Sequence, residues 1–219
     1  MIWQGRLIEN YLKSLPIIER DDISIEYSLT LSTQYKQKGA DIVSVIHEMI
    51  DLHIKNTPFD IAEMVGVLEE ADQTKAKNGY LAFLKWERET NPEWIHNEKM
   101  VYSRKYGYVG TFDAIARING KIYLVDFKSA SGFYEMDHRL QTSAYAMAYM
   151  EEFPEEIIEG RLIILCTKED KEKDGKLVAI AGEVQVYEIS DEMQEDFVAF
   201  ISAKNLFQRN KKFADNWKK

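Results

Sequence analysis

The segment Tyr106–Ser129 reads YGYVGTFDAIARINGKIYLVDFKS and holds an Asn119-Gly120 pair between two runs rich in apolar and β-branched residues. Asn-Gly is the strongest short-range signal for a two-residue hairpin, because both central residues of a type I′ turn have positive φ. The segment therefore predicts a β-hairpin in which residues at equal distances from the turn face each other.

Two acids and a lysine come together in this hairpin. Asp113 would face Asp126, and facing residues project to the same side of the sheet with Cβ atoms about 5 Å apart. Lys128 shares that side because side chains alternate along a strand. Facing carboxylates repel each other, and a divalent cation such as Mg²⁺ or Mn²⁺ would remove the repulsion. The cluster indicates a site, although solvated strand-edge acids with Lys128 as their counterion would show the same pattern.

Helical spacing of apolar residues precedes the hairpin. Residues 41–56, DIVSVIHEMIDLHIKN, predict a helix with His47 at the margin of its apolar arc. A single histidine on a helix is more often a packed or exposed residue than a ligand. Further helices are predicted over residues 60–71, with Asp60 as the N-cap, and over 74–90. Residues 23–31, ISIEYSLTL, fit either a strand or an extended lead-in.

A strand over residues 94–103 is predicted to join the hairpin through a turn at 104–107. A four-residue turn would place Glu98 opposite Asp113, so that Glu98, Asp113 and Asp126 would lie across three adjacent strands. A slip of one residue would send Glu98 to the other face of the sheet.

The remainder of the chain predicts a helix over 137–152, a strand over 161–167, a charged loop turning at Asp174-Gly175, a strand over 177–189 and a closing helix to about 208. Gln141 and Tyr145 share one face of the first of these helices. We expect one α/β (α+β) domain with a central mixed sheet flanked by helices. Its parts are a mostly helical portion (1–93), the sheet core with a helix (94–190) and a C-terminal helix with a basic tail (191–219).

Composition narrows the class of protein. The chain has 219 residues, 45% of them hydrophobic, and a net charge of −9, which indicates a globular protein. The single cysteine, Cys166, excludes a disulfide framework and a cysteine-ligated iron–sulfur cluster. No signal peptide or membrane span is indicated, so we expect an intracellular protein.

The C-terminal stretch is basic despite the acidic total. Aromatic residues Phe207, Phe213 and Trp217 lie among its lysines and arginine, which are Lys204, Arg209, Lys211, Lys212, Lys218 and Lys219. The stretch fits either an arm that contacts nucleic-acid phosphates or the solvated face of a terminal helix.

The motifs and their order resemble the RecB-like exonuclease branch of the PD-(D/E)XK nuclease superfamily. The matching text, which spans roughly residues 40–150, is Val45-Ile46-His47-Glu48, Gly110-Thr111-Phe112-Asp113, Asp126-Phe127-Lys128-Ser129 and Gln141-Thr142-Ser143-Ala144-Tyr145. Phe112 stands where the nominal signature has proline, and Ser44 stands where many relatives have glycine. The resemblance implies a restriction-endonuclease-like core.

The resemblance also implies roles for individual residues. His47, Asp113 and Asp126 would ligate one or two Mg²⁺ or Mn²⁺ ions. The carbonyl of Phe127 would be a further ligand, and Glu98 would support a metal or a water. Lys128 would position or deprotonate the attacking water, with its pKa lowered by the cation.

The remaining site residues implied by the resemblance would contact DNA, and they are Gln141, Tyr145 and Ser129. The implied activity is metal-dependent DNA hydrolysis at linear single- or double-stranded ends, in phage or mobile-element recombination or repair.

No GxxxxGK[ST] motif occurs, so unwinding would need a partner such as a helicase, and a single-strand annealing protein is a second candidate partner. The alternatives are a restriction-type endonuclease, a non-catalytic DNA-binding module on a nuclease fold, and an α/β domain whose polar residues are structural.

Overall fold

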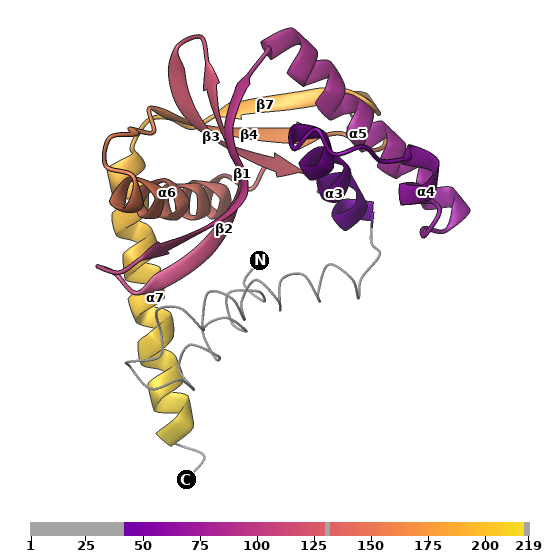
Figure 1. The fold of residues 1–219 in the computed structure, drawn as a ribbon. Coiled ribbons are helices and arrows are strands. Elements are labelled where there is room, and N and C mark those ends of the chain that lie inside the picture. The colour runs from indigo at the N-terminus through magenta and orange to yellow at the C-terminus, as the bar shows by residue number, and fades with distance from the viewer. Residues whose placement is uncertain (1–41, 130–131, 217–219) are drawn as a thin grey trace.

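The computed structural model describes residues 42–129 and 132–216 (Figure 1). The candidate strand at 23–31 lies outside these residues. The elements in chain order are α3 (Ile42–Ile54), α4 (Ile61–Val65), α5 (Glu70–Thr90), β1 (Glu93–Ser103), β2 (Tyr108–Ile118), β3 (Lys121–Lys128), α6 (Glu135–Glu152), β4 (Gly160–Cys166), β5 (Lys171–Lys173), β6 (Lys176–Ala179), β7 (Val184–Glu188) and α7 (Met193–Asn216).

Five strands form one mixed sheet in the order β1-β2-β3-β4-β7. Strands β3 and β4 are parallel, and the other neighbouring pairs are antiparallel. Parallel neighbours need a crossover connection, which α6 supplies. Helices α3 and α5 cover one face of the sheet, and α6 and α7 cover the other (Figure 1). The predicted mixed sheet flanked by helices is confirmed.

The Asn-Gly turn sets the register of the central hairpin. Asn119 and Gly120 both have positive φ, at 49° and 84°, as the predicted turn requires. The observed pairs run from Ile118 opposite Lys121 to Ala114 opposite Val125, in the predicted register. The paired ladder ends there, one step before Asp113 and Asp126.

The turn between β1 and β2 is also as predicted. Ser103 faces Tyr108 across residues 104–107, and Gly107 has a φ of 62°. Glycine adopts this left-handed conformation without the steric cost of a Cβ atom.

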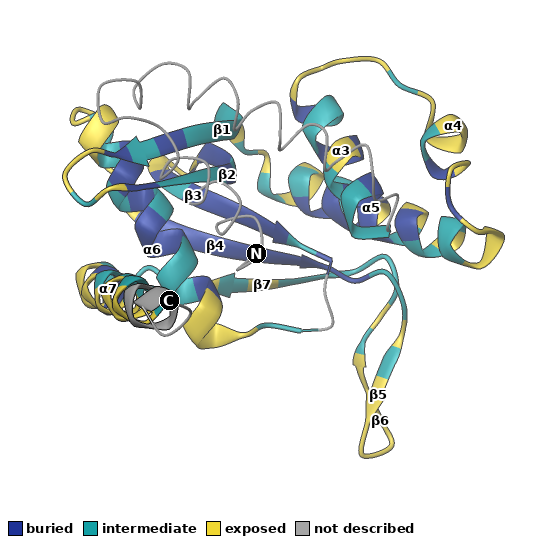
Figure 2. Ribbon diagram, turned by 90° about the horizontal axis from the view of Figure 1, so that it is seen from below, coloured by how far each residue is buried: buried dark blue, intermediate teal, exposed yellow. Residues whose placement is uncertain are grey.

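Alternation along β3 divides its side chains between two cores. Val125 and Phe127 pack with α3 and α5, whereas Ile122 and Leu124 pack with α6 and α7. The first core is built on aromatic rings from α5 and β1, and the Phe127 ring lies 5.4 Å from that of Phe83. The central strands are therefore buried on both faces, as Figure 2 shows.

Several predicted elements were wrong in extent. The closing helix, expected to end at about residue 208, is α7 and continues to Asn216, and the helix expected over 74–90 is α5 and begins at Glu70. The predicted helix over 60–71 is only α4, which begins at the N-cap Asp60 as expected and ends at Gly66. The predicted strand over 177–189 is broken at Gly182, where φ is 78°. Its first half pairs with β5 in a mostly exposed hairpin that extends away from the sheet (Figure 2), and its second half is the edge strand β7.

A buried ion pair joins the sheet to the C-terminal helix. The Arg161 side chain on β4 is fully buried, and its Nη2 lies 2.6 Å from Oδ2 of Asp196 on α7. The same guanidinium donates to the carbonyls of Arg139 and Asp191. A buried charge is costly unless it is paired and hydrogen-bonded, so these contacts make Arg161 compatible with the core.

We expect Arg161→Met to lower the free energy of unfolding by about 3 kcal/mol, because the change leaves Asp196 buried beside a single remaining partner, Arg139. The control is Arg117→Met, which removes the exposed pair with Glu93 and is expected to cost about 1 kcal/mol or less. Urea unfolding of the two variants and the parent chain measures both values. Equal losses would contradict the structural role given to Arg161.

Candidate metal centre

Three potential metal ligands from three separate elements converge midway along β1 and β2, where the β2–β3 ladder ends. They are His47 on α3, Glu98 on β1 and Asp113 on β2, and one ligand atom from each lies within 4.8 Å of the others. His47 Nδ1 lies 3.9 Å from Asp113 Oδ1, and both side chains are about four-fifths buried. An imidazole with two carboxylates is a donor set that suits a divalent cation.

A break in side-chain alternation brings Glu98 into this group. On one side of it, Asn97 bonds to Asp51 of α3. On the other side, the Lys99 ammonium lies 3.8 Å from the Phe153 ring centroid at the end of α6. Regular alternation would send both neighbours of Glu98 to the same face, so the chain switches faces at Glu98. A left-handed backbone with φ of 43° makes this switch.

Strand β2 switches faces at Asp113, opposite Glu98. Phe112 packs in the core on the α6 side, whereas Ala114 packs in the core on the α3 side. Asp113 thus lies at the point where β2 changes from the α6 side to the α3 side of the sheet. One of its oxygens lies near His47, and the other accepts a 2.7 Å hydrogen bond from the backbone N–H of Phe127 on β3.

The second acid of the hairpin lies beside this group rather than within it. Asp126 is buried, and its Oδ2 lies 2.5 Å from Nζ of Lys128. Burial acts to lower the pKa of Lys128, but the charges of Asp126 and Asp113 outweigh burial and raise it. The ammonium therefore offsets the charge of Asp126. The group within 4.8 Å includes Glu98, which the sequence placed opposite Asp113, and the ligand role of Asp126 stays a prediction.

Phe127 links the site to the core. Its side chain packs edge-on against Phe83, Trp86 and Trp94, while its backbone N–H holds Asp113. The ligand role of its carbonyl stays a prediction.

Gln141 and Tyr145 approach the site from α6. Gln141 Nε2 donates to the Tyr145 hydroxyl at 2.8 Å, and the Tyr145 ring lies so close to Gly110 that a Cβ there would come within 2.3 Å of it. Burial and the charges of Asp126 and Asp113 raise the pKa of Tyr145, so the hydroxyl is protonated at neutral pH. It can still donate one hydrogen bond.

Apart from Asp126 Oδ2, which forms the ion pair with Lys128, three buried polar atoms near these residues lack a hydrogen-bond partner among the described residues. They are Ser129 Oγ, His138 Nδ1 and Gln141 Oε1. Buried polar atoms are normally paired, so these atoms call for water or a ligand. His138 was missed from the sequence, although its spacing from Gln141 places both on one face of α6. Burial and the charge of Lys128 lower the pKa of His138.

Other candidate groups belong to the scaffold. His53, the second histidine of α3, contacts the Tyr80 hydroxyl at 3.0 Å and Glu87 at 2.7 Å, and so joins α3 to α5. Burial, with a contribution from Asp113, raises the pKa of Cys166 to about 12, so its thiol is protonated and is a poor metal ligand.

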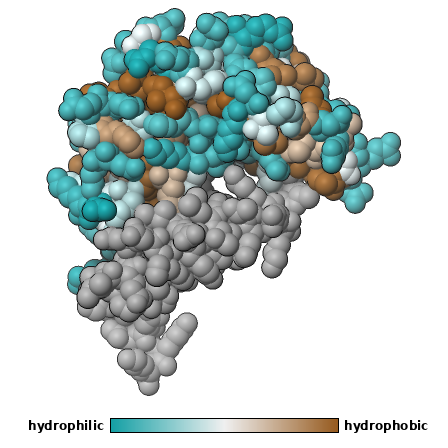
Figure 3. Space-filling model, in the orientation of Figure 1, coloured by the Kyte–Doolittle hydropathy of each residue, from teal (hydrophilic) through white to brown (hydrophobic). Residues whose placement is uncertain are grey.

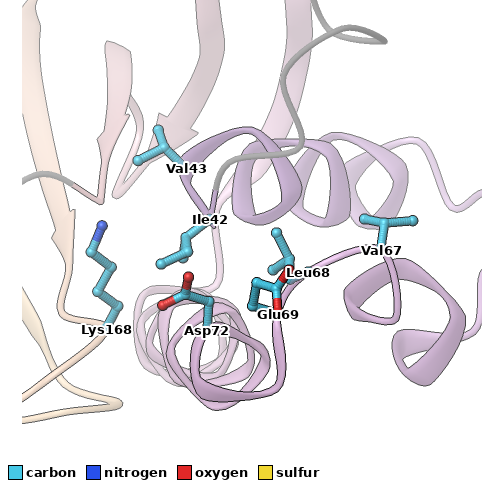
Figure 4. Close-up of a pocket in the computed structure, with 7 residues that line it drawn as sticks. All are labelled: Ile42, Val43, Val67, Leu68, Glu69, Asp72 and Lys168. Atoms are coloured by element: carbon cyan, nitrogen blue, oxygen red, sulfur yellow. The ribbon is translucent and has the colours of Figure 1, made fainter.

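A cavity of about 460 Å³ lies at the start of α3 (Figure 4). None of the predicted site residues lines it. Its lining residues are Ile42, Val43, Val67, Leu68, Glu69, Asp72 and Lys168.

Within the described ranges, no helix combines the length and apolar character needed to span a bilayer. Hydrophilic residues are spread over the face shown in Figure 3, and apolar residues form separate patches.

Of the basic C-terminal stretch, Lys204 donates from Nζ to the carbonyl of Tyr106 at 2.7 Å and so holds α7 against the β1–β2 turn. The proposed phosphate contacts of the stretch stay a prediction.

Comparison with known proteins gives three results. Residues 27–218 match the family model described as the PD-(D/E)XK nuclease superfamily. No curated protein matches the sequence. Among solved structures, a protein described as a "putative exonuclease" from Eubacterium rectale is similar with a TM-score of 0.46 and 9% identity, over 75% of this chain and 65% of that chain. The family match covers most of the sequence, and the chain therefore belongs to the PD-(D/E)XK nuclease superfamily.

Proposed function

We propose that the protein is a metal-dependent DNA exonuclease of the RecB-like branch. The observation that carries the proposal is the convergence of His47, Glu98 and Asp113 beside the Asp126–Lys128 ion pair. Acids alone are common on protein surfaces, but this group is largely buried and includes an imidazole and an adjacent ammonium.

The donor set fits a divalent ion. Two carboxylates offset its charge, and the imidazole makes Mn²⁺ at least as suitable as Mg²⁺. His47, Glu98 and Asp113 would hold the ion, with Asp126 and the Phe127 carbonyl as the further ligands that the family resemblance implies. When bound, the ion neutralises charge on the scissile phosphate and lowers the pKa of the attacking water.

The remaining residues would position the reacting groups. Lys128 has three N–H donors, so it can keep its contact with Asp126 and still donate to the attacking water or to a phosphate oxygen. Tyr145 can donate its hydroxyl proton to the DNA backbone while it accepts from Gln141. Ser129 and Gln141 offer the unpartnered atoms that a bound strand or ordered water would satisfy.

An exonuclease is favoured over a restriction-type endonuclease by two features of the family resemblance. These are the upstream His47 and the Gln141–Tyr145 pair on the helix after the Asp126-Phe127-Lys128 motif. Recombination or repair of phage or mobile-element DNA is the setting proposed for this activity.

Cleavage of end-labelled linear DNA tests the activity. With Mn²⁺ or Mg²⁺ we expect the parent chain to shorten linear DNA from its ends, and a chelator to stop the reaction. Lys128→Ala should abolish cleavage because it removes the donor beside the site and leaves Asp126 unpaired. Lys121→Ala, an exposed lysine at the other end of β3, is the control and should cleave at the parent rate.

A covalently closed circular substrate in the same assay separates the two kinds of nuclease. An exonuclease leaves the circle intact, so cutting of the circle would support the endonuclease alternative. Cleavage of linear DNA by Lys128→Ala at the parent rate would exclude the assigned site.

Thermal unfolding with Mn²⁺ tests the metal site without a substrate. Because a ligand that binds only the folded state stabilises it, Mn²⁺ at 100 times its Kd should add about 2.7 kcal/mol. Asp113→Asn and Glu98→Gln should remove most of this gain. Asp174→Asn, an acid-to-amide change in the distant β5–β6 turn, should keep it, and an unchanged gain in Asp113→Asn would refute the site.

A further inference from the structure

A hydrogen-bonded contact joins α3 to β1 next to the candidate metal ligands. The Asn97 side-chain Nδ2 lies 2.7 Å from Oδ1 of Asp51 and 3.3 Å from the Asp51 carbonyl oxygen. The other carboxylate oxygen of Asp51 accepts from Lys55 at 2.8 Å. The Asn97 side-chain amide on β1 therefore contacts both the side chain and the backbone of Asp51 on α3.

Each partner in this contact adjoins a candidate ligand. Asp51 follows His47 by four positions and so lies on the same face of α3. Asn97 immediately precedes Glu98, the residue whose left-handed backbone turns its side chain toward the site. The contact thus connects the helix that carries the imidazole with the strand position that carries a carboxylate.

The backbone at Glu98 departs from the regular ladder of β1 and β2. The register of β1 with β2 passes from Asn97 opposite Ala114 to Lys99 opposite Phe112, and the facing pair Glu98 and Asp113 is skipped. A non-glycine residue in a left-handed conformation is strained and persists only when its surroundings hold it in place. The bonds from Asn97 to α3 supply part of that restraint on the N-terminal side of Glu98.

We propose that Asn97 is a positioning residue for the metal site, acting through Asp51 to set the distance between His47 and Glu98. This inference rests on the proposed function, because it assigns Asn97 a role in metal affinity. Asn97 does not itself contact the ion. Its loss would leave the three donors present but with a looser spacing, and a metal site needs its donors held to within about 0.5 Å.

Calorimetric titration of Mn²⁺ into the full chain, without DNA, tests this role. Residues that orient metal ligands typically change affinity by 10- to 100-fold when mutated, so Asn97→Ala should weaken Mn²⁺ binding by about tenfold or more. Asn97→Leu, which keeps a similar volume but cannot donate, should show the same loss. Circular dichroism shows whether each variant is folded. If Asn97→Ala is not folded, the Mn²⁺ affinity of Asn97→Leu tests the positioning role.

The matched control is Asn78→Ala. Asn78 is also half-buried and also donates from Nδ2 to a backbone carbonyl, that of Lys168, at 3.2 Å, but it lies outside the candidate site. This variant should bind Mn²⁺ like the parent chain even if its melting temperature falls, so the titration separates positioning from general stability.

The outcomes are distinct. If the parent chain binds Mn²⁺ and the folded Asn97 variants bind it with the same affinity, the positioning role is wrong and the proposed function stands. If the parent chain does not bind Mn²⁺, both proposals fail together.

Discussion

The switch of side-chain direction at Glu98 and Asp113 is the constraint on which the candidate site depends. A regular strand would present these residues to a single layer, whereas the site draws ligands from α3 on one face and neighbours from α6 on the other. The left-handed backbone at Glu98 makes the switch. Asp113 then lies 3.9 Å from the imidazole of His47 on α3 and accepts a hydrogen bond from the Phe127 backbone N–H on β3. Backbone strain of this kind concentrates where function requires it.

Electrostatics explains why the site needs an ion or an ammonium. Glu98, Asp113 and Asp126 bring three carboxylates to the region of a largely apolar sheet where the β2–β3 ladder ends, and like charges in a poorly solvated region repel strongly. Lys128 offsets one of them through its contact with Asp126. A divalent cation at His47, Glu98 and Asp113 would offset the other two. The same negative charges raise the pKa of Lys128, and burial together with these charges raises the pKa of Tyr145, so both groups stay protonated and can donate hydrogen bonds to a phosphate.

Local rules account for what could be predicted from the sequence. The Asn119-Gly120 turn and the four-residue turn at 104–107 each determine a strand register, because the conformation of a turn sets which residues face each other. The N-cap at Asp60 follows from its side chain and the first helical turn alone. The same local rules failed over residues 177–189, where an alternating stretch fits one strand but Gly182 divides it between a projecting hairpin and the sheet edge.

The sequence by itself determined the mixed sheet, the hairpin and the acids at its open end. Only the tertiary structure decided which groups meet. His47 lies close to Glu98 and Asp113, and Asp126 forms an ion pair with Lys128 beside them. The facing of Glu98 and Asp113 follows from the turn at 104–107. The approach of His47 depends on how α3 packs against β1, and the direction of the Glu98 side chain depends on the sign of one φ angle. Neither of these follows from residue spacing within a single element. His138 likewise lies near Lys128 and Asp126 only because α6 packs on the face of the sheet to which those β3 side chains point.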